Sequence, residues 1–142
     1  MVLREKGHVV MDRFRVGGLD PHRRYLHVRV IVCRNREELG AMTKLPEDDL
    51  WRPSALFVPV GYEMIAKSGG LVGSIWLCPG PKIEAFAIHE SIHAAFHVSG
   101  YRMTWSREGQ EWEEFIARTS EEIFWHISKR IRAKGISQRR GK

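Results

Sequence analysis

Residues 83–98 constrain the fold of this chain more than any other stretch. They hold the pattern His-Glu-x-x-His, as His89, Glu90 and His93, among residues that favour helix. An α-helix turns about 100° per residue, so the two histidines are expected about 40° apart on one face. The many apolar neighbours predict a helix that is mostly buried and that ends at Gly100.

Two imidazoles one helical turn apart are suited to holding one zinc ion. The carboxylate of Glu90 beside them is suited to accepting a proton from water, which makes it a candidate general base. His97 lies about 12 Å along the helix from His89, too far to share an ion whose bonds are about 2 Å long. We therefore expect His89 and His93 to be metal ligands and His97 to be a packed side chain or one that supports a ligand without binding the metal.

The chain has 142 residues, of which 43% are hydrophobic, and this composition predicts one domain with one core. We expect the domain to cover residues 1–135 and a basic, disordered tail to cover residues 136–142. There is no apolar run of about 18 residues and no signal-peptide pattern, so we expect a soluble, cytoplasmic protein without a membrane partner. Cys33 and Cys78 lack a C-x-x-C spacing, which favours reduced core thiols.

The hydrophobic pattern predicts an α+β fold with a small, mainly antiparallel sheet of about three to five strands. Strands are expected over residues 8–16, 25–33, 55–60 and 71–78. The last two are expected to pair as neighbours. Pro59 favours a sheet edge or a strand end for residues 55–60.

Helices are expected on both sides of the central pattern. Asn35 and Glu38 predict a capped helix over residues 36–44. Apolar residues at helical spacing predict a long helix over residues 110–134. We expect this helix and the one over residues 83–98 to pack on the same side of the sheet.

Catalytic zinc takes three protein ligands, so two histidines leave one ligand to be found. The long helix offers a group of carboxylates near its start: Glu111, Glu113, Glu114, Glu121 and Glu122. On a helical wheel Glu113 lies nearer than Glu114 to the apolar face that contains Ile123. His126 is a further candidate, and most of the acidic residues also complement the helix dipole.

The motif followed by Glu-x-x-Ala on a second helix, as Glu114 to Ala117, resembles the gluzincins. The short chain and the strand before the motif helix look like minigluzincins, including short zincin-like proteins of bacteriophages. The resemblance covers about residues 55–128. It implies a zinc-dependent metallopeptidase in which Glu114 is the third ligand beside the two histidines. Because the wheel favours Glu113, both positions and Glu111 stay open.

The resemblance also implies a place for the substrate. The strand expected to run from Leu71 to Cys78 would be a sheet edge to which an extended peptide adds as a further strand. Tyr101, His126 and Arg118 are candidate donors for the oxyanion of the reaction.

The charge of the chain suggests a second class of function. The formal net charge is +6, with basic residues gathered in residues 1–36 and 129–142 and acidic residues between them. The basic tail from Lys129 to Lys142 gives the alternative, a binding module for nucleic acid or an acidic partner with a structural or vestigial zinc site.

Overall fold

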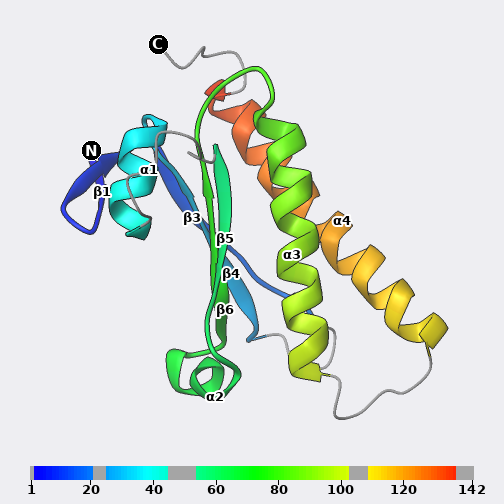
Figure 1. Cartoon of the computed structure of the whole chain (residues 1–142). Coiled ribbons are helices and arrows are strands. Elements are labelled where there is room, and N and C mark those ends of the chain that lie inside the picture. Colours follow the sequence, from blue (N-terminus) through cyan, green and yellow to red (C-terminus); the bar gives the residue numbers. More distant parts are fainter. Residues whose placement is uncertain (1, 21–24, 45–53, 103–108, 137–142) are drawn as a thin grey trace.

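A computed structural model describes residues 2–20, 25–44, 54–102 and 109–136, and the side chains of residues 102 and 109–111 lie outside the description. Figure 1 shows a sheet with helices on both of its faces. In chain order the elements are β1 (Leu3–Glu5), β2 (His8–Val10), β3 (Asp12–Val16), β4 (His27–Val32), α1 (Arg36–Thr43), β5 (Ala55–Pro59), α2 (Tyr62–Ile65), a 3-10 turn (Ala66–Ser68), β6 (Leu71–Leu77), α3 (Ile83–Arg102) and α4 (Gly109–Ala133).

The strands form a two-stranded sheet, β1–β2, and a four-stranded sheet in the order β3-β4-β6-β5. The β3–β4 and β5–β6 pairs are antiparallel, while β4 and β6 are parallel. The predicted α+β class with small, mostly antiparallel sheets is confirmed. So are the pairing of β5 with β6 and the edge position of β5.

The prediction that residues 71–78 form a sheet edge is wrong. Strand β6 hydrogen-bonds β4 on one side and β5 on the other, so it has no free edge for a peptide. In chain order β4 comes first, then α1 and β5, and β6 comes last. In the sheet, β6 lies between β4 and β5. Its nearly continuous burial is typical of an interior strand.

The predicted start of α1 is confirmed, whereas the predicted end of α3 is wrong. Asn35 caps α1 as predicted, because its side chain accepts a hydrogen bond of 2.9 Å from the Glu38 N–H. Helix α3, however, continues through Gly100 to Arg102. A Cβ at residue 100 would lie 2.0 Å from the Tyr62 hydroxyl oxygen. The small Gly100 leaves room for the Tyr62 hydroxyl, and it does not end the helix.

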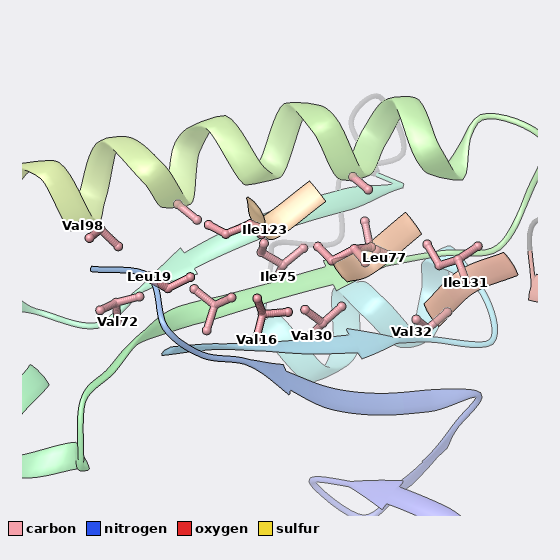
Figure 2. Close-up of a cluster of buried hydrophobic side chains, with 14 of the residues drawn as sticks. Val16, Leu19, Val30, Val32, Val72, Ile75, Leu77, Val98, Ile123 and Ile131 are labelled. Carbon is pink, nitrogen blue, oxygen red and sulfur yellow. The ribbon is translucent and has the colours of Figure 1, made fainter. Parts of the chain in front are cut away.

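The main core lies between the sheet and the helix pair α3–α4, as Figure 2 shows. The predicted apolar stripe of α4 is confirmed from Thr119 to Ile131, which are buried, whereas Trp112 at its predicted start is exposed. A second, smaller cluster lies on the other face of the sheet, where Leu39 and Met42 of α1 pack on β4 and β6. The two faces of the sheet are therefore covered by different helices (Figure 1).

Ile136, the first residue of the predicted tail, is packed in the domain. Ile136 is buried in the main core, so the domain extends past residue 135 because this side chain completes the apolar packing beneath α4. Residues 137–142, the rest of the predicted tail, lie outside the described residues. None of the helices in the described ranges is long and apolar enough to span a membrane.

Candidate metal centre

Helix α3 carries its two motif histidines on an exposed face. The Nε2 atoms of His89 and His93 lie 3.2 Å apart, and their ring centroids lie 4.8 Å apart. Two imidazole nitrogens on one tetrahedral zinc, with bonds of about 2.0–2.1 Å, are separated by about 3.3–3.4 Å. The two nitrogens therefore already converge at a spacing that suits two positions of one coordination sphere.

Glu90 lies beside this pair but is turned into the protein. It is 7% exposed, and its Oε2 lies 4.0 Å from Nε2 of His89. Burial raises the pKa of the Glu90 carboxyl above its usual range, while the nearby His89 and His93 and a backbone hydrogen bond from Phe57 oppose that rise. A higher pKa makes a carboxylate a better proton acceptor near neutral pH.

The hydrogen bond from Phe57 places Glu90 at the free edge of β5. Cys78 N–H donates to Ser54 O and Val60 N–H donates to Val72 O, so the even-numbered residues of this segment are bonded to β6. Hydrogen bonding alternates along an antiparallel strand, so the N–H and C=O of Phe57 point away from β6. The Phe57 N–H therefore faces the Glu90 carboxylate on the side of β5 that pairs with no other described strand.

His97 joins α3 to the end of the same strand, as expected for a packed residue. Its Nε2 lies 2.7 Å from the Val60 carbonyl oxygen. Its ring stacks on Tyr62 at a centroid distance of 4.6 Å and meets the Phe57 ring edge-on. These contacts fix the distance between the Glu90-bearing helix and β5.

Among the described residues, no third ligand lies beside the two histidines. Glu114 is exposed and pairs with Arg118 on its own helix, with Nε and Oε1 3.1 Å apart. Glu113 is also exposed, and the side chain of Glu111 lies outside the described part of the chain. Within the described ranges, no three side chains of His, Cys, Asp or Glu gather closely enough to hold a metal ion. Glu114 as the third ligand stays a prediction.

The remaining candidates have other neighbours. His126 Nδ1 lies 2.9 Å from the Glu122 carbonyl oxygen, and the ring of Tyr101 lies beside that of Tyr62. Arg118 is engaged by Glu114. The structure therefore gives no preference among the three predicted oxyanion donors.

Sequence reasoning missed the exposed apolar stripe on α3. Ile88, Ile92 and Phe96 are 40–51% exposed and run alongside the two histidines, so the expectation of a mostly buried helix is wrong for this face. The sequence shows their i, i+4, i+8 spacing. Helical periodicity alone, however, does not say which of the two apolar faces of a helix packs on the sheet. The small residues Ala87, Ala94 and Ala95 take the buried side because they allow close packing.

The two cysteines provide no further reactive site. Both are buried free thiols, and burial is the main cause that raises the pKa of Cys33 and raises the pKa of Cys78 to about 12. Neither thiol therefore ionises at neutral pH, and both are weak nucleophiles and weak metal ligands.

Comparison of the chain with protein-family models, with curated proteins and with solved structures finds no match.

Proposed function

We propose that this protein is a zinc-dependent peptidase in which His89 and His93 are two of the metal ligands and Glu90 is the general base. The observation that carries the proposal is the convergence of the two Nε2 atoms, 3.2 Å apart, next to a carboxylate held by the β5 edge. The donor set suits zinc, for which imidazole nitrogen is a common ligand. Bound zinc lowers the pKa of a water molecule and polarises a carbonyl group.

The role of Glu90 follows from its surroundings. Its carboxylate accepts a proton from the water that attacks the scissile carbonyl and passes it to the leaving amine. The Phe57 N–H holds the carboxylate in place, and burial keeps it a stronger base than an exposed glutamate. Because Glu90 follows His89 directly, it is beside the ligands without being one of them.

Strand β5 replaces β6 as the surface that would bind an extended peptide. Its free edge offers the N–H and C=O of Ala55 and the C=O of Phe57, while Pro59 has no N–H to offer. A peptide added to this edge would run past Glu90, which touches Phe57. Backbone pairing of this kind needs no particular substrate sequence.

The first test measures zinc and hydrolysis in the same set of variants. Zinc bound per protein is determined after dialysis against dilute zinc, and hydrolysis is followed with a mixture of quenched fluorescent peptides. Wild type is expected to bind about one zinc. Replacing both His89 and His93 by Ala should abolish binding, whereas His8→Ala, a histidine on β2, should not.

The variant Glu90→Gln tests whether Glu90 is a general base or a zinc ligand. It should keep the zinc and lose hydrolysis by roughly 10²–10⁴-fold, the usual contribution of a general base. Zinc binding that survives removal of both motif histidines would refute the proposed site. Zinc binding by wild type with no hydrolysis of any peptide would refute the proposed reaction and leave the metal site standing.

The third ligand is tested by Glu114→Ala and Glu113→Ala. Loss of zinc affinity only in Glu114→Ala supports the register of the gluzincin-like pattern. Loss only in Glu113→Ala would identify Glu113 as the third ligand, the position nearer the apolar face of α4. If neither variant loses affinity, Glu111→Ala and then His126→Ala are the next variants to measure.

The alternative of a binding module rested on the basic segment that ends the chain. Residues 137–142 of that segment lie outside the described residues. Nothing in the described segment from Lys129 to Ile136 favours it over the peptidase, so we keep the peptidase as the proposed function.

A further inference from the structure

The face of the sheet opposite α3 and α4 carries a cluster of arginines that the proposed peptidase does not use. Strand β3 alternates between buried Asp12 and Val16 with half-buried Phe14 between them on one side, and exposed Arg13 and Arg15 on the other. The register places Arg15 directly opposite Arg29 of β4. We call Arg13, Arg15 and Arg29 the arginine face.

The position of this face follows from the strand pattern. Side chains two residues apart on a strand point to the same side, so Arg29 shares its side with Ile31. Ile31 packs in the smaller core cluster with Leu39 and Met42 of α1. The arginine face is therefore on the α1 side of the sheet, which Figure 1 shows on the opposite side from α3 and α4.

The arginine face is poorly neutralised. Glu5 Oε1 pairs with Arg29 and lies 3.7 Å from Nη1 of Arg13, so one carboxylate serves two guanidinium groups. The guanidinium of Arg15 has no ion-pair or hydrogen-bond partner among the described residues, and Arg15 is exposed. Like charges directly opposite on neighbouring strands repel, with Cβ atoms about 4.5–5.5 Å apart. An anion bound between Arg15 and Arg29 would remove this repulsion.

The guanidinium groups of the arginine face indicate which kind of anion it would bind. Guanidinium groups bind phosphate in a two-pronged geometry. A protein partner would need apolar anchors in desolvated pockets, but the row Arg15–Arg29–Ser74–Val58 offers only Val58, which is 39% exposed. Nucleic acid needs no such anchor, because phosphate contacts dominate its affinity. We propose that the arginine face binds the phosphate backbone of nucleic acid without reading its sequence.

This inference does not depend on the peptidase, since it concerns the opposite face of the sheet. It predicts binding of a labelled 20-nucleotide DNA or RNA of mixed sequence, measured by fluorescence anisotropy with the full-length protein. Arg15→Gln should weaken binding on the order of five- to eightfold at 0.1 M salt, because each phosphate contact contributes a salt slope of about 0.7–0.9. The slope of log affinity against log salt concentration should itself fall by about 0.7–0.9 in Arg15→Gln.

The matched control is Arg118→Gln. It removes the same charge from α4, where Glu114 already neutralises the arginine. It should leave the affinity within about twofold, because an already neutralised cation releases few counterions. Arg15→Lys should bind nearly as well as wild type, since it retains the charge. Arg15 has no ion-pair or hydrogen-bond partner among the described residues, and Arg118 makes one exposed ion pair, so thermal unfolding of all three variants should stay within about 1 kcal/mol of wild type.

Several outcomes would overturn the inference. One is no binding at low salt, and another is equal weakening by Arg15→Gln and Arg118→Gln, which would indicate net charge alone. Binding that disappears on deletion of residues 137–142 but is indifferent to Arg15→Gln would assign it to the C-terminal segment. Displacement by poly-glutamate as readily as by unlabelled nucleic acid would identify an acidic protein as the partner.

Discussion

Replacing Arg130 by Met should unfold this protein at a clearly lower temperature, because Arg130 is the cation that neutralises a fully buried carboxylate. Asp12 on β3 is 0% exposed, and its two oxygens lie 2.8 and 2.9 Å from Nε and Nη2 of Arg130 on α4. Its only other hydrogen bond in the described structure comes from the Arg13 N–H, at 3.0 Å. Without Arg130 the charge of Asp12 remains buried and uncompensated.

The size of the effect follows from the geometry. Breaking a buried ion pair by removing one partner costs about 3–5 kcal/mol. Arg130 is 40% exposed, so water can partly replace it, and we expect the lower end, about 3 kcal/mol. For a chain of this size that corresponds to a fall in melting temperature of about 10 °C. Chemical denaturation and calorimetry measure both quantities.

Two comparisons make the reasoning refutable. Arg118→Met breaks an exposed pair with Glu114 on the same helix and should cost less than about 1 kcal/mol. Adding Asp12→Asn to Arg130→Met removes the buried charge, so the double variant should recover about 2 kcal/mol. If Arg130→Met is no worse than Arg118→Met, or if the Asp12 change adds its own loss, then the pair does not hold β3 to α4.

Two further predictions concern other buried groups. With zinc removed by a chelator, Glu90→Gln should be more stable than wild type at pH 7, because burial raises the pKa of Glu90 and the ionised carboxylate opposes folding. That advantage should shrink as the pH falls through the raised pKa and vanish below the ordinary pKa of an exposed glutamate, and an advantage independent of pH in denaturation experiments would contradict it. Ile136→Ala should lower the free energy of unfolding by about 2–4 kcal/mol because it leaves a cavity in the main core, whereas a chain that ends at residue 136 should unfold like the full chain.

The parts of the site that the sequence determined are those set by neighbours along the chain. The i, i+4 spacing of His89 and His93 brings their nitrogens to 3.2 Å within a single helix turn. The cap at Asn35 and the buried stripe through Ile123 and Ile127 follow in the same way, since each depends on residues within one helix. These features were predicted because helical periodicity fixes them locally.

Tertiary pairing decided the rest. Strand β6 became interior because β4, from far earlier in the chain, pairs along its second side, and no local pattern records that choice. The burial of Glu90 and its bond to Phe57 depend on where the β5 edge meets α3. Gly100 lies inside α3 rather than at its end, with the hydroxyl of Tyr62 against it. Contacts between segments distant in sequence depend on the packing of whole elements, so only the folded structure could place Glu90 beside the edge of β5.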